Sequence, residues 1–331
     1  MVPRKSSSHI GPKRKLGPPL LSLATLQREC NAHRPRYARL IEAARPRLLA
    51  KSRELAVIIP VRGRHQQVRP CVTSLQRSAA AAGLSISIMI VENDAKRHLE
   101  SSTRQLGTEY LFLPKTSSKH GHMAKSLCYN TAFLLLRPTK WVMFHDIDML
   151  VDLSFFSNLS TYTATNPSWI QPYTQKRVML LPQSTTNAIQ SSEDPPTAEQ
   201  LATAVPADAG STGGSVVVRG DVAQAVGCYD PELFYGWGPE DAFFWAKLEV
   251  YAGAAAHRDQ WQANRGHMGG AVYANNPPIE MYHLWHPPAN PKGRDSRLDK
   301  QNHYLASFYG LPRRDQIELI KLKEGALCRS R

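Results

Sequence analysis

The chain has 331 residues, enough for one large domain or two small ones, and its hydrophobic fraction of 42% excludes an intrinsically disordered protein. No apolar run reaches the length of about 18 residues that a membrane span needs, and the basic N-terminus lacks the apolar stretch of a secretory signal. The five cysteines are scattered without CxxC spacing. We therefore expect a reduced, cytoplasmic protein without a cysteine-built metal site.

The formal net charge of +14 is concentrated at the two ends of the chain. Residues 1–53 carry a net charge of +11 and residues 313–331 a net charge of +3, which leaves the central body neutral. Such ends are either solvated basic tails or contacts for an anionic partner, such as nucleic acid, a membrane surface or an acidic glycan. Charge alone does not choose between them.

The first predicted elements lie outside the main domain. Residues 1–20 are rich in Ser, Pro, Gly and Lys/Arg without periodicity, so we expect a disordered basic tail. Residues 21–53 predict a basic helical extension that is interrupted at Pro35 and Pro46. The main domain is expected over residues 54–312, followed by a basic C-terminal tail over residues 313–331.

Strands and helices alternate in the first half of this domain. The run "LAVIIPV" (55–61) is short and rich in β-branched residues, as is typical of a buried strand. Further strands are predicted at 85–94, 109–114 and 140–148, with helices at 68–83 and 121–136. This order predicts an α/β fold of Rossmann-like type, with a mixed, mostly parallel sheet flanked by helices.

Polar residues follow three of these predicted strands. They are Arg62 and Arg64, then Asp94, then Asp146 and Asp148. In parallel sheets the ligand lies beyond the carboxyl ends of the strands, so we expect these side chains to converge on one site.

The segment 182–212 is long and rich in Ser, Thr, Ala and Pro. Loops of this length in a compact domain are usually lids, binding loops or insertions, and we expect a flexible loop or lid here.

The stretch "FHDIDM" (144–149) ends an apolar strand with two aspartates one residue apart. Strand alternation predicts that Asp146 and Asp148 point to the same side. Two carboxylates so close together repel unless a cation compensates them, and oxygen ligands of this kind suit Mg²⁺ or Mn²⁺.

Five motifs in order resemble the beta-1,4-galactosyltransferase-like glycosyltransferases, which have the GT-A fold. They cover roughly residues 55–290: "VIIPVRGR" (57–64), "GHMAKSLCYNTAF" (121–133), "FHDIDM", "GGSVVV" (213–218) and "FYGWGPEDAFF" (234–244). The last is similar to the family's Trp-Gly-x-Glu-Asp segment, although Pro239 stands where a glycine is more usual.

The resemblance implies an inverting, metal-dependent transferase that moves a sugar of Gal, GalNAc or Glc type from a UDP-sugar to a hydroxyl acceptor, for which a glycan is expected. Mn²⁺ (or Mg²⁺) would stabilise the departing diphosphate. The metal ligand that it implies first is Asp148, with Asp146 either as a second ligand or in contact with the ribose. A histidine is a further ligand, for which His283 is preferred to His286. It implies Asp241 as the base, with Glu240 beside it recognising a sugar.

On the donor side, the resemblance implies nucleotide or sugar contacts for eight residues. They are Pro60, Arg62, Arg64, Asp94, Lys125, Asp146, Gly214 and Trp237. The competing interpretations are ordinary ones: surface charge for the arginines, a helix N-terminal pair for Glu240 and Asp241, and core packing for Trp237.

Two other functions stay open at this point. The basic ends would suit a glycosyltransferase that acts on hydroxymethylated bases in DNA, with salt-dependent binding and base flipping. The chain could also be a non-catalytic sugar-binding relative, although such a protein needs neither a leaving-group metal nor a base. The donor sugar, acceptor, linkage and oligomeric state are not determined by the sequence.

Overall fold

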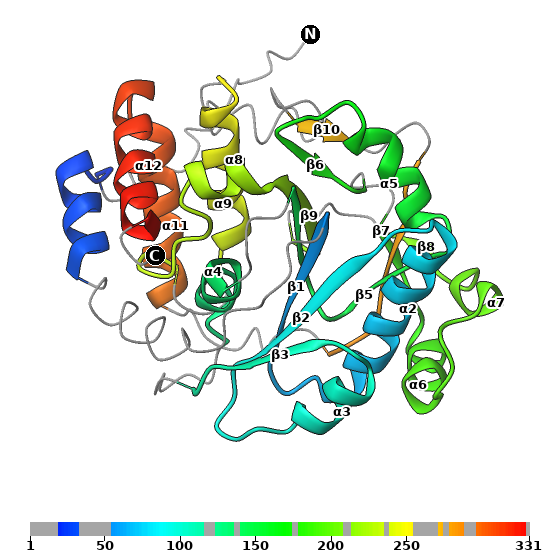
Figure 1. Cartoon of the computed structure of the whole chain (residues 1–331). Helices are drawn as coiled ribbons and strands as arrows, with labels where there is room; N and C mark the ends of the chain where they lie inside the picture. The colour runs from blue at the N-terminus through cyan, green and yellow to red at the C-terminus, as the bar shows by residue number, and fades with distance from the viewer. Residues whose placement is uncertain are drawn as a thin grey trace, which may run out of the picture.

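A computed structural model gives the fold (Figure 1). It describes residues 19–32, 54–115, 123–135, 140–173, 178–207, 213–234, 238–253, 271–273, 278–287 and 296–328. The predicted fold class is confirmed, because a mixed, mostly parallel sheet lies between two layers of helices.

The main sheet has seven strands in the order β10-β6-β9-β4-β1-β2-β3. β1 pairs in parallel with both β2 and β4, and β2 pairs in parallel with β3. β9 runs antiparallel to its neighbours β4 and β6. The strands are β1 (Leu55–Val61), β2 (Ile86–Glu92), β3 (Glu109–Phe112), β4 (Trp141–His145), β6 (Trp169–Gln171), β9 (Ser215–Arg219) and β10 (Ala271–Tyr273).

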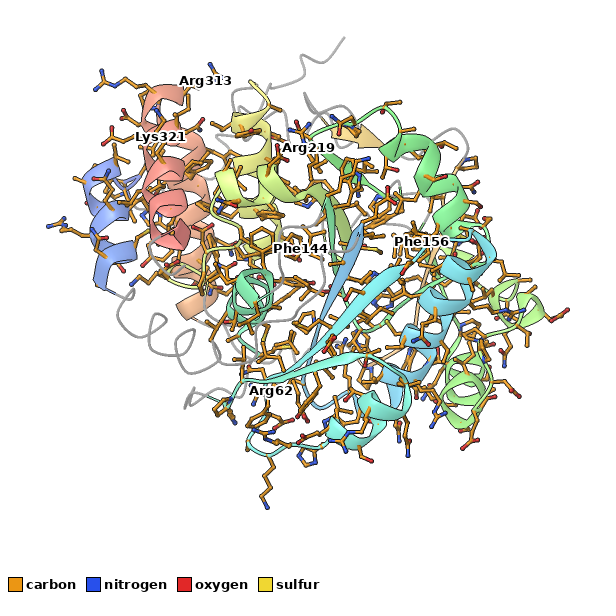
Figure 2. All side chains as sticks on the ribbon, in the orientation of Figure 1. Arg62, Phe144, Phe156, Arg219, Arg313 and Lys321 are labelled. Atoms are coloured by element: carbon orange, nitrogen blue, oxygen red, sulfur yellow. The ribbon has the colours of Figure 1, made fainter. Side chains whose placement is uncertain are left out.

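The central strand β1 is buried on both faces. Its seven residues are all buried, and alternate side chains enter different cores: Ile58 packs on one side of the sheet, and Val57 and Ile59 on the other. Figure 2 shows the two cores on either side of the sheet, one at Phe144 and one at Phe156. Burial on both sides explains why this strand reads as a continuous apolar run.

Helices cover both faces (Figure 1). The Phe144 side carries α4 (Lys125–Leu135), α8 (Gly220–Ala225), α9 (Glu240–Tyr251), α11 (Ser296–Gly310), α12 (Arg313–Cys328) and a helix over residues 23–32. The other side carries η2 (His65–Gln67), α2 (Val68–Ala81), α3 (Glu100–Gln105) and α5 (Phe155–Thr163).

A second, four-stranded sheet was not predicted. Its order is β5-β11-β7-β8, formed by β5 (Met149–Val151), β11 (Met281–His283), β7 (Val178–Leu180) and β8 (Val205–Pro206). β11 runs antiparallel to β5, and this register pairs His283 with Met149. The small sheet thus carries a histidine from late in the chain to the residue after Asp148.

The prediction of a flexible loop at 182–212 is wrong for most of that segment. Residues 183–206 contain α6 (Gln183–Ser191), α7 (Ala198–Leu201) and β8. Ile189 and Leu201 are buried, and Thr197 with Gln200 forms a capping box at the start of α7. These two buried apolar side chains and the cap help to hold this polar stretch against the domain. Residues 208–212 lie outside the described residues.

The prediction of a basic tail at 313–331 is also wrong, because residues 313–328 form α12. Leu319 is buried in the core, and Lys323 is buried with its Nζ 3.2 Å from Asp230 and 3.0 Å from Glu232. The domain therefore extends past the predicted boundary at residue 312.

At the other end, residues 23–32 are helical within the predicted extension, whereas residues 1–18 and 33–53 lie outside the described residues. Within the part that the structure describes, no helix has the length and apolar character needed to cross a membrane.

Candidate active site

The site forms at the carboxyl edge of the parallel strands. Arg64 follows β1, and Asp146 and Asp148 follow β4, which pairs in parallel with β1. The antiparallel strand β9 brings its first residues to the same edge, so Gly214 lies beside Asp146. The parallel pairing explains why residues far apart in sequence meet here.

The two aspartates of "DID" do not point to the same side, contrary to the prediction. β4 ends at His145, and a turn follows in which the Met149 N–H donates to the Asp146 carbonyl at 3.1 Å. Strand alternation does not continue through a turn. Asp146 contacts Lys125, whereas Asp148 contacts Arg64 and lies near His283 and His286.

Asp148, His283 and His286 form a candidate metal centre, with one ligand atom of each residue within 4.8 Å of the others. Asp148 Oδ2 lies 3.3 Å from His286 Nε2 and 3.7 Å from His283 Nε2. The structure therefore brings both candidate histidines to the same carboxylate. Asp146 is not in this cluster; its predicted role as a direct ligand has no support in this arrangement.

The electrostatics of this cluster favour a charged carboxylate. Burial by itself would raise the pKa of Asp148, but the hydrogen bond with His286 and the charges of His283 and Arg64 lower it well below its ordinary value. The hydrogen bond with Asp148 raises the pKa of His286, and burial lowers the pKa of His283. A stably ionised carboxylate is the form that binds a cation.

The ring orientation makes His286 a suitable ligand. Its Nδ1 lies 2.8 Å from the carbonyl oxygen of Pro287, which suits an Nδ1–H donor and directs Nε2 toward Asp148. Metal-binding histidines are commonly oriented by such a bond from the other ring nitrogen. His283 is fixed through its backbone instead, because it pairs with β5.

This donor set fits a divalent transition metal. Two imidazoles and one carboxylate suit Mn²⁺, Fe²⁺ or Zn²⁺ better than Mg²⁺, which prefers oxygen ligands throughout. The residues present therefore fit a divalent ion at this centre.

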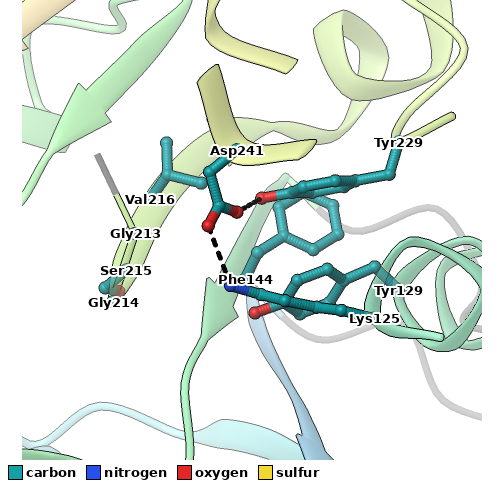
Figure 3. Close-up of a pocket in the computed structure, with 9 residues that line it drawn as sticks. All are labelled: Lys125, Tyr129, Phe144, Gly213, Gly214, Ser215, Val216, Tyr229 and Asp241. Atoms are coloured by element: carbon teal, nitrogen blue, oxygen red, sulfur yellow. Dashed lines mark hydrogen bonds and ion pairs between the residues drawn. The ribbon is translucent and has the colours of Figure 1, made fainter. Parts of the chain in front are cut away.

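A second group of charges lies next to the metal centre, around Lys125 at the start of α4. Lys125 Nζ is 2.8 Å from Asp146. It is also 2.9 Å from Asp241 (Figure 3). Tyr129 donates to Asp146 and Tyr229 donates to Asp241, both at 3.1 Å. One ammonium group thus joins the first aspartate of "DID" to the carboxylate at the start of α9.

Burial shapes the ionisation of this group. It would lower the pKa of Lys125, but Asp146 and Asp241 raise it well above its ordinary value, so the ammonium stays charged. Burial raises the pKa of Asp241, with Lys125 opposing the change. Burial and the neighbouring Asp241 raise the pKa of Glu240 to about 8. Perturbed carboxylates of this kind are typical of acid–base sites.

A small pocket opens beside these groups, between the start of β9 and the helices α4 and α9 (Figure 3). Its lining consists of Lys125, Tyr129, Phe144, Gly213, Gly214, Ser215, Val216, Tyr229 and Asp241. Charged groups meet aromatic rings here, a composition that suits a polar ligand with an apolar face.

Gly214 is required by the backbone of this pocket. Its φ is +99°, and a Cβ there would lie 3.2 Å from Tyr173 Oη and 3.4 Å from the Met149 side chain. Its N–H donates to the Asp146 carboxylate at 3.1 Å, and its carbonyl accepts from the Asp146 N–H at 2.8 Å. The glycine therefore lets β9 lie close against the "DID" turn.

The remaining sequence candidates are distributed around this edge. Pro60 is buried inside β1, where it is paired with Val91. Arg62 is half-buried, and its Nη1 has no hydrogen-bond partner among the described residues. Asp94 lies in a separate cluster with His65 and Glu92. Trp237 lies outside the described residues.

The sequence interpretation missed both tyrosines. Tyr129 lies four residues after Lys125, which places the two side chains on one face of α4, with Nζ 5.8 Å from the ring centroid. That spacing was a usable signal. Tyr229 gave no such signal, because its contact with Asp241 joins residues that are 12 apart in the chain and do not share a helix.

No protein-family model and no curated protein matches the chain. Three solved structures illustrate what it is similar to. The catalytic domain of Drosophila beta1,4-galactosyltransferase 7 with xylobiose is 13% identical over 75% of this chain and 79% of that chain, with a TM-score of 0.43. A mannosyltransferase from Pyrobaculum calidifontis with GDP-Man and Mn²⁺ is 11% identical over 93% and 86%, with a TM-score of 0.44.

The third is TarS 1–349 from S. aureus with UDP-GlcNAc, 10% identical over 81% of this chain and 70% of that chain, with a TM-score of 0.45. At such low identities and TM-scores, these matches carry no argument about what the present chain binds or catalyses.

Proposed function

We propose that the chain is a metal-dependent, inverting glycosyltransferase of the GT-A type, which transfers a Gal-, GalNAc- or Glc-type sugar from a UDP-sugar to a hydroxyl acceptor, most simply on a glycan. The main observation behind this proposal is that Asp148, His283 and His286 converge at one edge of the sheet. The carboxylates of Asp146 and Asp241, which Lys125 joins, lie at the same edge. The five motifs that resemble the galactosyltransferase-like family support the same assignment.

The donor half of the reaction needs stabilisation of a departing diphosphate. A divalent ion held by Asp148, His283 and His286 would supply Lewis-acid stabilisation of that charge. Arg62 and Arg64 follow β1 at the same edge, and a guanidinium can bind phosphate oxygens through two parallel hydrogen bonds. These residues would hold the nucleotide by its phosphates.

The acceptor half needs a base, and Asp241 suits this role. It lines the pocket, and its raised pKa makes the ionised form a better proton acceptor than an exposed aspartate. As the acceptor oxygen bonds to the sugar C1, its proton passes to Asp241. The bond from C1 to the phosphate oxygen breaks, and the electron pair leaves with the diphosphate.

Glu240 would recognise a substrate hydroxyl. Its Oε2 is buried without a hydrogen-bond partner in the part of the chain that the structure describes. With a pKa of about 8, the side chain carries a proton at neutral pH and can donate a hydrogen bond. Burial of such a group is costly unless a ligand satisfies it.

The test is a donor panel of UDP-, GDP- and dTDP-sugars, assayed for nucleotide release with Mn²⁺, with Mg²⁺ and after chelation. We expect release from a UDP-sugar that depends on the metal and is faster with Mn²⁺. Asp148→Ala should abolish it.

Two outcomes would contradict the proposal. Sugar binding without any nucleotide release, across the panel and with added acceptor hydroxyls, would indicate a sugar-binding protein. Release that is equally fast after complete chelation would exclude the metal-dependent mechanism.

A further inference from the structure

The guanidinium of Arg64 lies inside the candidate metal centre. Arg64 follows Gly63, whose φ of +63° forms the turn after β1. Its Nη1 donates a hydrogen bond to Asp148, and its Nη2 lies 3.3 Å from Nδ1 of His286. One side chain therefore contacts two of the three candidate ligands.

The contacts that Asp148 makes in this centre meet at one of its oxygen atoms. Arg64, His283 and His286 each approach Oδ2 of Asp148. Oδ2 is also the Asp148 oxygen that faces both histidines, so a divalent ion bound between these three residues would lie against the guanidinium and repel it. The hydrogen bond with Arg64 and a bond to the metal ion are therefore alternatives.

The two partners differ in their freedom to move. The side chain of Asp148 is 9% exposed, whereas that of Arg64 is 36% exposed. Asp148 is also fixed through its backbone, since its carbonyl accepts from the Leu284 N–H at 2.8 Å. When a cation binds, Arg64 is the group that has room to leave.

We propose that Arg64 competes with the divalent ion for Asp148, and that ion binding releases its guanidinium to bind the diphosphate of the donor. The inference rests on the metal centre of the proposed function. Since the ion displaces Arg64 and a phosphate captures it, each ligand favours the binding of the other. Arg64 thus makes metal and nucleotide binding cooperative and disfavours the ion alone.

The experiment is a Mn²⁺ titration followed by the electron paramagnetic resonance of the free ion, with and without UDP. Without UDP, Arg64→Gln should bind Mn²⁺ about 10-fold more tightly than the wild type, since it lacks the competing charge-assisted hydrogen bond. The factor by which UDP tightens Mn²⁺ binding should shrink by a similar amount. Arg64→Lys keeps the positive charge but loses the planar guanidinium with its several N–H donors. Its Mn²⁺ affinity should fall between those of the wild type and Arg64→Gln.

The matched control is Arg62→Gln, which removes the same charge two residues earlier. Arg62 forms no ion pair with Asp148 within the described structure, so its Mn²⁺ affinity without UDP should stay within about threefold of the wild type. A similar gain in Mn²⁺ affinity in Arg62→Gln and Arg64→Gln would show only a general effect of removing a positive charge, and it would overturn the inference. Thermal melting without metal checks that each variant is folded.

The inference fails separately from the proposed function. If the wild type binds Mn²⁺ and Arg64→Gln binds it equally or more weakly, competition is excluded while the metal centre stands. If neither protein binds Mn²⁺, both the centre and the competition are wrong. The titration without UDP needs no turnover and does not depend on the identity of the nucleotide.

Discussion

Lys125 Nζ lies 2.9 Å from the Asp241 carboxylate and 2.8 Å from that of Asp146, so a residue of α4 joins the carboxyl end of β4 to the start of α9. This arrangement explains how several charges are tolerated in a buried site, because each carboxylate also accepts a tyrosine hydroxyl. The energetic cost of burial is offset only while all of these partners are present.

The base assignment predicts a specific loss of transfer in Asp241→Asn. The amide keeps the shape of the side chain but cannot accept the acceptor proton. We expect the rate of sugar transfer to fall by about 10²–10⁴-fold, while the affinities for Mn²⁺ and UDP stay within about threefold. Transfer at the wild-type rate in this variant would show that another group is the base.

The metal assignment predicts that both histidines matter. His283→Ala and His286→Ala should each weaken Mn²⁺ binding by about 10-fold or more, as measured by calorimetry. His303→Ala, a change on α11 outside both the Asp148 cluster and the Asp94 cluster, is the control and should leave Mn²⁺ affinity unchanged. If only one of the two variants lost affinity, the other histidine would not be a ligand.

The backbone at Gly214 predicts a costly alanine substitution. Gly214→Ala combines an unfavourable φ with a Cβ crowded by Tyr173 and Met149, so we expect the free energy of unfolding to fall by about 2–3 kcal/mol. Gly107→Ala is the matched control, because its φ is +66° but no atom lies within 4 Å of the added Cβ. It should cost about 1 kcal/mol. If urea denaturation showed the same loss of unfolding free energy for both variants, crowding of the added Cβ at Gly214 would not contribute to the destabilisation.

The packing of α12 predicts that Lys323 is structural. Lys323→Met leaves Asp230 and Glu232 without this buried counter-ion and should lower the free energy of unfolding by about 3–5 kcal/mol. Lys321→Met, on the exposed surface of the same helix (Figure 2), should change it by less than about 0.5 kcal/mol. Similar melting of both variants would mean that α12 does not anchor the domain through this contact.

Glu249 predicts a pH dependence of stability. It is buried on α9, and burial raises its pKa from the ordinary 4.5 to about 8. The folded protein keeps this proton up to about pH 8, whereas the unfolded chain releases it near pH 4.5. The contribution of Glu249 to stability therefore falls as pH rises through this window and stays low above it.

Glu249→Gln removes this ionisation. Relative to the wild type, the variant should gain stability between pH 4.5 and 8, by a few kcal/mol at most at pH 8–9, with little difference at pH 4. The exposed Glu193→Gln is the control and should show no such trend. A stability difference that does not change with pH would contradict the buried, protonated state of Glu249.

Much of the central sheet was predictable because its signals are local. The seven residues of β1 match the predicted strand at 55–61, and α2 matches its predicted helix closely. Both elements have continuous or periodic apolar residues bounded by turn-forming ones, which a short window of sequence reveals. The polar residues that follow the strands were predicted from the same local signal, because each comes directly after an apolar run.

The errors arose where local pattern and packing diverge. The strand predicted over 140–148 ends at His145, because a turn held by Gly214, the residue before β9, interrupts it. The segment around α6 appeared to be a loop because it is polar, yet Ile189 anchors it in the core. One or two buried apolar residues in a polar stretch produce no periodicity that the sequence alone would reveal.

The sequence by itself determined the fold class and indicated the charged residues of the candidate site, because a buried strand and the polar residues that follow it are consecutive in the chain. Only the tertiary structure decided that Asp146 belongs with Lys125, and Asp148 with Arg64 and both histidines. The physical reason is that the three-residue strand β11 has no periodicity of its own. Its pairing with β5, which places His283 beside Asp148, depends on backbone hydrogen bonds between distant segments.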